Sequence, residues 1–170
     1  MDLKDKVRHV LDFPKPGIDF IDITPLLQNA AVFEYIINRF VEELENIDFD
    51  LIACSEARGF ILGAPVAHKL KKGFIPIRKQ NKLPAEKVSV KYDLEYGYDI
   101  LEIHADAVKP GQKVVIIDDI LATGGTLKAN IELIEKLGGK VQKVLYLIEL
   151  AELNGKEKLN GYDIFAMEKM

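Results

Sequence analysis

The sequence predicts one α/β domain in which helices flank a mainly parallel sheet. Short apolar runs rich in β-branched residues alternate with longer segments of helical periodicity, and no repeat or linker divides the 170 residues. Alternation of this kind is typical of βαβ units, which produce parallel strands. A chain of this length with 48% hydrophobic residues can bury one full core. We therefore expect a single domain over residues 1–170.

The individual elements follow from periodicity and from helix-breaking residues. We expect strands at 51–54, 74–77, 114–117, 141–150 and 162–165, and helices at 30–46, 60–71 and 127–137. Asn29 is the expected N-cap of the first long helix, and Gly138-Gly139 ends the last one. Pro76 lies within an expected strand, at a place where one backbone amide is unpaired. Residues 2–11 could form a short helix before the prolines and glycine of 13–17.

Residues 79–98 have no clean period. A connection of this length inside a compact domain is usually a lid or a binding loop. Its four lysines repel one another, so we expect a flexible loop that becomes ordered when an anion binds. The alternative is an exposed β-hairpin with solvated lysines, and composition alone does not separate the two.

Composition excludes several classes of protein. The net charge of −4 argues against general affinity for nucleic acid. No apolar run approaches the ~20 residues that a membrane span requires. The first six residues lack the order of a signal peptide, and the single cysteine cannot form an internal disulfide. These observations predict a cytoplasmic protein with no nucleic-acid or membrane partner.

The segment 114–126 carries the most specific chemical signal. An unbroken β-branched run, typical of a strand buried on both faces, leads into Asp118 and Asp119. A turn of small residues follows and opens a helix: Ala122, Thr123, Gly124, Gly125 and Thr126. Ligands bind beyond the carboxyl ends of parallel strands, where a glycine turn and a helix start present backbone amides to a phosphate. The two carboxylates only accept hydrogen bonds, so vicinal ribose hydroxyls are their natural partners.

Other readings of this segment fit less well. A strand-end turn with two solvated acids would not require the apolar run, the acid pair and the Gly-Gly turn to occur together. The chain has no Gly-x-Gly-x-x-Gly motif, and the residues after Thr123 do not match Walker A spacing.

The segment 114–126 resembles the phosphoribosyl pyrophosphate motif of the type I phosphoribosyltransferases. Six further blocks, in the same order, resemble the adenine phosphoribosyltransferase family: 13–17, 23–25, 55–60, 78–84, 94–97 and 109–112. The resemblance covers nearly the whole chain. It implies the type I fold with a small N-terminal hood at about 1–29 and a flexible lid at about 79–98. The implied reaction joins adenine to phosphoribosyl pyrophosphate and gives AMP and pyrophosphate in purine salvage.

The resemblance also implies roles for individual residues. Residues 122–126 would bind the 5-phosphate, while Asp118 and Asp119 face the ribose hydroxyls. The pyrophosphate would meet a set of cations: Arg58, Arg78, Lys79 and Lys82. The loop that receives it often contains a cis peptide, here Glu56–Ala57. Fixed cations stabilise the charge that develops on a leaving pyrophosphate.

In the expected lid, Glu95 is the candidate acid/base, and Tyr96 would lie near the ligand. Desolvation on closure would raise the pKa of Glu95 towards a useful range. The tentative base contacts are residues of the hood and of the strand end: Asp19, Phe20, Ile21 and Leu121. Relatives commonly carry a basic residue at the place of Ile21, so the hood departs from the family there and at Asp19.

The family further implies Mg²⁺, carried mainly on the pyrophosphate oxygens, and a homodimer. Three scattered histidines lack ligand spacing, so we predict no protein metal site. Two alternatives stay open at this point. One is a hypoxanthine, guanine or xanthine transferase on the same scaffold. The other is a non-catalytic regulator that senses phosphoribosyl pyrophosphate.

Overall fold

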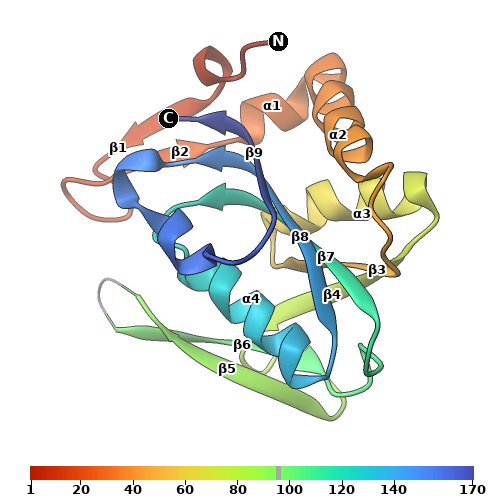
Figure 1. Ribbon diagram of the computed structural model, residues 1–170. Coiled ribbons are helices and arrows are strands. Elements are labelled where there is room, and N and C mark those ends of the chain that lie inside the picture. Colours follow the sequence, from red (N-terminus) through yellow and green to blue (C-terminus); the bar gives the residue numbers. More distant parts are fainter. Residues whose placement is uncertain (95–96) are drawn as a thin grey trace.

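A computed structural model describes residues 1–94 and 97–170 (Figure 1). Its main sheet has the strand order β5-β6-β4-β3-β7-β8-β9. The bounds are β3 (Leu51–Ser55), β4 (Gly73–Lys79), β5 (Lys87–Asp93), β6 (Tyr98–His104), β7 (Lys113–Leu121), β8 (Lys140–Glu149) and β9 (Ile164–Lys169). From β4 to β9 the neighbouring strands are parallel, whereas β5 and β6 pair antiparallel. The predicted α/β class with a mainly parallel sheet is confirmed.

Helices cover both faces of this sheet (Figure 1). The α-helices are α1 (Thr24–Gln28), α2 (Ala30–Leu44), α3 (Arg58–Leu70) and α4 (Gly125–Lys136), and short 3₁₀ segments are η1 (Lys4–Lys6), η2 (Ala151–Leu153) and η3 (Gly155–Leu159). One core lies beneath α2 and α3, and a second lies beneath α4 and the β5–β6 hairpin. In the described part of the chain, none of the helices combines the length and apolar character needed to cross a bilayer.

Strand β7 is shared by the two cores. Val115 and Ile117 belong to the core under α2 and α3, whereas Val114 and Ile116 belong to the core under α4. All four side chains are fully buried, as expected from alternation along a strand covered on both faces. The strand is longer than predicted and remains paired with β8 as far as Leu121. The acid pair therefore lies within the sheet instead of following it.

The predicted elements 30–46 and 74–77 are also confirmed. The side chain of Asn29 accepts a hydrogen bond from the Val32 amide at 3.2 Å and caps α2 as expected. Pro76 lies inside β4, and β6 pairs with β4 at Arg78 and Lys79, beyond the proline. Pro76 has no amide hydrogen to donate, and this is tolerated because β6 pairs with β4 only beyond the proline.

The short helix expected over residues 2–11 is wrong. The chain there forms η1 and then β1 (Arg8–Leu11), which pairs antiparallel with β2 (Asp19–Asp22). Leu3 is buried in the core, whereas Leu11 is 73% exposed, so the segment has no continuous apolar face to hold a helix against. Short helices without such packing are marginal, and pairing with β2 satisfies the backbone instead. The hairpin β1–β2 is the hood.

The segment 79–98 contains strand β5, which pairs antiparallel with β6. Val90 pairs with Leu101, and both side chains are buried. The sequence allows two interpretations of the segment, a flexible lid or an exposed β-hairpin. Its strands pair as in a β-hairpin. Closure of the segment over a ligand stays a prediction. Helix α4 packs against β5, so the hairpin contributes to the core under α4 (Figure 1).

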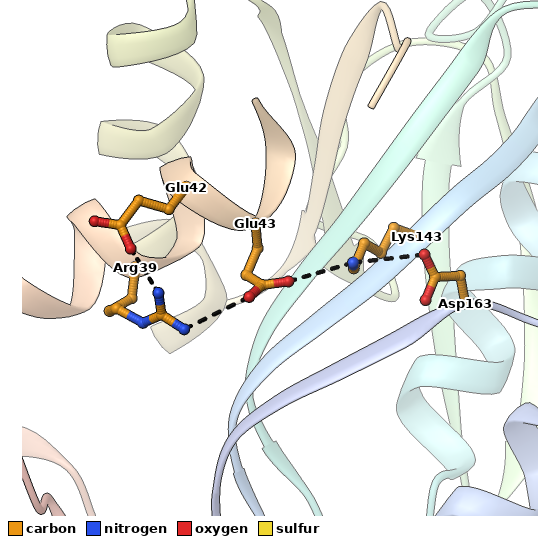
Figure 2. A network of polar contacts seen from close by, with 5 residues as sticks. All are labelled: Arg39, Glu42, Glu43, Lys143 and Asp163. Atoms are coloured by element: carbon orange, nitrogen blue, oxygen red, sulfur yellow. Dashed lines mark hydrogen bonds and ion pairs between the residues drawn. The ribbon is translucent and has the colours of Figure 1, made fainter. Parts of the chain in front are cut away.

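A chain of ion pairs links α2 to strand β8 and to Asp163, the residue before β9 (Figure 2). Arg39 lies 2.5 Å from Glu42 and 3.5 Å from Glu43. Lys143, whose side chain is 12% exposed, lies 3.4 Å from Glu43 and 3.5 Å from Asp163. Partly exposed pairs each contribute about 1 kcal/mol or less, so this network orients α2 more than it stabilises the fold.

Candidate functional site

The candidate site lies where the carboxyl ends of β3, β7 and β8 meet the hood. A cavity of about 360 Å³ opens there. It is lined by the hood, the segment after β3, the end of β7 and the segment after β8: Ile18, Asp19, Phe20, Ile21, Ser55, Glu56, Ala57, Arg58, Asp118, Asp119, Ile120, Ala122, Thr126, Leu150 and Leu153. Ligands of open parallel sheets bind at this edge. The structure therefore brings together residues that are up to 135 positions apart (Ile18 and Leu153).

The two carboxyl groups of the acid pair have different surroundings. Each residue is only 6% exposed. Asp118 accepts hydrogen bonds from the Ser55 hydroxyl at 2.9 Å and from the Asp119 amide at 2.9 Å. Asp119 instead faces Arg58, whose Nε lies 2.6 Å from its Oδ2. Neighbouring residues of a strand point to opposite sides, which explains why the pair divides in this way.

Burial raises the pKa of Asp118, and the nearby charge of Asp119 raises it further, to about 8. The hydrogen bonds from the Asp119 amide and from Ser55 oppose this shift. The protein therefore holds a carboxyl group that is costly to ionise. A ligand that donates hydroxyl hydrogen bonds to the pair would reduce this cost.

The turn after β7 forms a second, smaller cavity of about 60 Å³. Its lining is the continuous stretch Ile120, Leu121, Ala122, Thr123, Gly124, Gly125, Thr126 and Leu127. Gly124 has a positive φ of 81° and is the N-cap of α4. The first turn of a helix carries amides without intrahelical partners and a partial positive charge. The turn thus presents amides without intrahelical partners and a partial positive charge, an environment that suits a small anion.

Gly155 closes this turn from a distant part of the chain. A Cβ atom at Gly155 would lie 2.1 Å from the Ala122 carbonyl oxygen and 2.8 Å from the Gly124 nitrogen. A Cβ atom at Gly124 would lie 2.4 Å from the Gly155 carbonyl oxygen. Backbone therefore packs directly on backbone here, and both positions require glycine.

The predicted cations reach the site in different ways. Arg58 begins α3 and lines the larger cavity. Arg78 and Lys79 contact the site through Glu56, which accepts from Arg78 Nε at 3.1 Å and from the Lys79 amide at 2.7 Å. Burial would raise the pKa of Glu56, but the Lys79 amide and the Arg78 guanidinium together lower it. Lys82 is exposed on the segment beyond β4.

The peptide bond between Glu56 and Ala57 is cis, as the family resemblance implies.

The hood supplies an aromatic face to the larger cavity. The guanidinium carbon of Arg58 lies 5.2 Å from the centroid of the Phe20 ring, and Phe13 packs edge-on against the same ring. Ile21, 5% exposed, and Asp19 line the cavity beside it. Asp19 also pairs with His9, its Oδ2 lying 2.7 Å from the histidine Nδ1.

The tentative base contact at Leu121 is corrected. Leu121 is 1% exposed and packs in the core under α4, whereas Ile120 lines the larger cavity. The two residues are neighbours at the end of β7, and their side chains lie on opposite sides of the strand.

The predicted lid residues Glu95 and Tyr96 lie outside the described residues. The neighbouring strand β5 contributes Tyr92, whose ring would be 3.1 Å from a Cβ atom at Gly125. The Thr126 hydroxyl donates a hydrogen bond to the Tyr92 hydroxyl at 3.4 Å. The hairpin that leads to the predicted lid therefore packs on the phosphate turn.

Comparison with known proteins identifies the family. Residues 23–167 match the family described as phosphoribosyl transferase domain. An adenine phosphoribosyltransferase of Caldicellulosiruptor saccharolyticus is 62% identical, with 96% of this chain and 94% of that protein covered. The chain belongs to the adenine phosphoribosyltransferase family.

Solved structures of the adenine phosphoribosyltransferase family have the same fold. The structure from Thermoanaerobacter pseudethanolicus superposes with a TM-score of 0.96 at 54% identity, covering 99% of this chain and 98% of that one. The structure from Saccharomyces cerevisiae, a complex with an imino-altritol bisphosphate and adenine, has a TM-score of 0.90 at 37% identity, covering 97% and 96%.

Sequence reasoning missed several residues of this family member's site. Ser55, Ile120 and Leu153 line the larger cavity, Gly155 closes the phosphate turn, and Asn130 lies behind the acid pair. Only Ser55 had a usable signal, since it ends a strand and is the first residue of the block 55–60. The others depend on contacts between segments that are distant in the sequence.

Gly155→Ala is expected to weaken phosphate binding. The new methyl group would overlap the Ala122 carbonyl, so the turn must move, and we expect a loss of about 1–3 kcal/mol in the free energy of unfolding. The affinity for ribose 5-phosphate, measured by calorimetric titration, should fall about tenfold, which corresponds to ~1.4 kcal/mol. Gly161→Ala is the control: this glycine has a φ of 94° and no heavy atom within 4 Å of a new Cβ atom, so the alanine should lower stability through backbone strain without changing the affinity. Equal affinities in wild type and Gly155→Ala would contradict this account of the turn.

Asp118→Asn is expected to make the protein more stable and less active. The folded-state pKa of Asp118 is raised, so its contribution to stability is present below about pH 4 and is lost as pH rises towards about 8. The amide has no such titration, and the variant should gain on the order of 1–4 kcal/mol at pH 8 relative to wild type. Denaturant unfolding at pH 5 and pH 8 measures the difference, which should be smaller at pH 5.

Asp119→Asn provides the comparison, because it removes the partner of Arg58 and should not stabilise the fold. A variant Asp118→Asn that loses stability equally at both pH values would show that Asp118 is not destabilised by burial.

Proposed function

We propose that this protein transfers the 5-phosphoribosyl group of phosphoribosyl pyrophosphate to adenine, giving AMP and pyrophosphate in purine salvage. The observation that carries the proposal is the junction of the two cavities, which share Ile120, Ala122 and Thr126. An anion-binding turn thereby adjoins an acid pair and an aromatic hood within one connected site. This sequence of environments matches a phosphate, a ribose and a purine base.

The 5-phosphate is proposed to bind in the smaller cavity. Residues 122–126 offer backbone amides at the start of α4 and the hydroxyls of Thr123 and Thr126. Fixed amide dipoles bind phosphate oxygens without reorganisation during the reaction. Binding there anchors the substrate at one end and leaves the anomeric carbon near the hood.

The ribose is proposed to lie against Asp118 and Asp119. Their carboxyl oxygens can accept hydrogen bonds from the two ring hydroxyls. As the bond to pyrophosphate breaks, the ribosyl group gains positive charge, and a buried negative charge nearby stabilises that state. The carboxyl groups of Asp118 and Asp119 would therefore serve both to bind the ribose and to stabilise its developing charge.

Pyrophosphate release is proposed to depend on Arg58. In the structure this guanidinium pairs with Asp119 and lies over the Phe20 ring. Its planar fork suits phosphate oxygens, so we infer that pyrophosphate draws it away from both partners. Arg78 and Lys79, held by Glu56, add positive charge beside the same loop, and Lys82 lies further out. Withdrawal of Arg58 also clears the face of Phe20 for the base.

Magnesium is proposed to enter with the pyrophosphate. Within residues 1–94 and 97–170, no group of three or more His, Cys, Asp or Glu side chains could hold a metal ion. An ion carried on pyrophosphate oxygens and water would offset the charge of the leaving group.

Adenine is proposed to lie against Phe20, with Ile21 and Leu153 as further apolar contacts and Asp19 at the edge.

We also propose that residues 1–170 act as one domain, with the hood over the base and residues 79–98 closing as a lid. A cytoplasmic homodimer without nucleic-acid or membrane partners completes the proposal. The burial of the single Cys54 fits a reducing compartment.

Steady-state assays with each purine test the proposed function. With phosphoribosyl pyrophosphate and Mg²⁺, adenine should give AMP at a kcat/KM at least about a hundredfold above that of hypoxanthine or guanine. Preference for a 6-oxopurine would overturn the choice of base. Absence of any nucleotide product would favour a regulator that only binds phosphoribosyl pyrophosphate.

Glu95→Gln is expected to lower turnover strongly while phosphoribosyl pyrophosphate still binds. If this carboxylate accepts the proton that adenine loses, its removal should reduce kcat by about 10²–10⁴-fold. Glu86→Gln is the matched control, because it removes an exposed carboxylate from the same segment. Rapid-quench kinetics and a binding titration separate turnover from affinity. Wild-type turnover in Glu95→Gln would remove this residue from the mechanism.

A further inference from the structure

A buried chain of polar side chains lies behind the acid pair. The Asn130 amide nitrogen, on α4, donates a hydrogen bond to the Ser55 hydroxyl oxygen at 3.1 Å. The Ser55 hydroxyl, at the end of β3, donates to Asp118 Oδ2 at 2.9 Å. The three residues come from three elements and are 63 and 75 positions apart along the chain.

Asn130 is costly for stability where it lies. Its side chain is fully buried, and its Oδ1 has no hydrogen-bond partner among the described residues. An unpaired buried amide oxygen loses its hydration without compensation, so an apolar residue of similar size would be tolerated at least as well. Asn130 is also absent from the lining of the larger cavity. The hydrogen bond to Ser55 is therefore the interaction that explains an amide side chain at this position.

This contact determines how Ser55 is oriented. A serine hydroxyl has one proton and can rotate, so by itself it may donate in several directions. Because Asn130 donates to the hydroxyl oxygen, the Ser55 proton is left to point to Asp118. The Asp119 amide donates to the other oxygen, Asp118 Oδ1, at 2.9 Å. Two donors from different strands thus fix the plane of the Asp118 carboxyl group.

We infer that Asn130 and Ser55 are positioning residues, which hold the Asp118 carboxyl group in the orientation that accepts the ribose hydroxyls. The inference rests on the proposed role of Asp118 in binding the ribose. Asn130 does not line the larger cavity, and Ser55, which does, is proposed to act through its hydrogen bond to Asp118. Their effect is to remove the freedom of a carboxyl group that would otherwise rotate within a buried site.

Several charged or titratable groups face Asp118 from the surrounding elements. They are Asp119 on the same strand, Cys54 on β3 and Tyr92 on β5, while Arg58 on α3 pairs with Asp119. Burial is the first cause of the raised pKa of Asp118, and the Ser55 hydrogen bond opposes it. Loss of the Ser55 donor should therefore move the ionisation of Asp118 to higher pH, while the other groups stay in place.

The decisive variant is Asn130→Leu. We expect its melting temperature to equal or exceed that of wild type, while KM for phosphoribosyl pyrophosphate rises about tenfold, as for a lost hydrogen bond near a charged group. KM for adenine should stay within about twofold, a change of ~0.4 kcal/mol. The control is Ile131→Val, a buried change on the same helix that should lower stability without changing either KM.

Variants at Ser55 supply an independent measurement. Ser55→Ala should raise KM for phosphoribosyl pyrophosphate to the same extent and shift the acidic limb of its pH profile to higher pH. Ser55→Thr keeps the hydroxyl and should restore both values. If the two residues act in series, Asn130→Leu combined with Ser55→Ala should be no worse than Ser55→Ala alone. These readouts remain available if Asn130→Leu does not fold.

The inference is overturned if Asn130→Leu folds and keeps the wild-type KM for phosphoribosyl pyrophosphate. It is also overturned if Ser55→Ala and Ile131→Val have the same kinetic constants and pH profile. Failure of the proposed function is a separate outcome, because wild type itself would then form no AMP from adenine and phosphoribosyl pyrophosphate.

Discussion

Two neighbouring carboxyl groups are buried at the end of one central strand, and the rest of the site depends on how that burial is compensated. Asp118 receives two hydrogen bonds from the protein, and Asp119 receives the Arg58 guanidinium. Neither arrangement resembles a solvated acid at the end of a strand. Burying like charges together is costly unless partners satisfy them. Ligand groups that donate hydrogen bonds or carry positive charge should therefore bind favourably at this pair. A ribose with two hydroxyls and a developing positive charge meets both preferences.

The same strand also explains why the fold can support this pair. Side chains of β7 alternate between two cores, which fixes the strand against both helical layers before it reaches the acids. The turn that follows is packed on two sides. Gly155 contacts its backbone at Ala122 and Gly124, and the Tyr92 ring packs against Gly125. Rigid packing therefore positions a small anion site beside the acid pair. Gly155 and Tyr92 contribute by their positions against the turn, and the sequence around each of them does not indicate this role.

Local sequence signals were sufficient for the elements whose interactions are local. The cap at Asn29, the β-branched run of β7 and the glycine turn each act over a few residues, and each could be predicted. The β1–β2 hairpin of the hood could not be predicted from such signals, because β1 is stabilised by pairing with β2 and not by its own periodicity. Strand β7 continues past its predicted end at residue 117 to Leu121, and in the structure Ile120 lines the larger cavity while Leu121 packs in the core under α4. Asn130 and Gly155 act on partners that only the tertiary fold brings near.

The central claim is that the backbone of the 122–126 turn and the adjoining acid pair form one phosphate and ribose site. A two-dimensional ¹H–¹⁵N NMR titration with ribose 5-phosphate tests it directly, because each amide reports separately. The account predicts the largest, saturable shifts at the amides of residues 123–126 and of Asp119, with small shifts along α2. Saturable shifts elsewhere with an unchanged turn would contradict it.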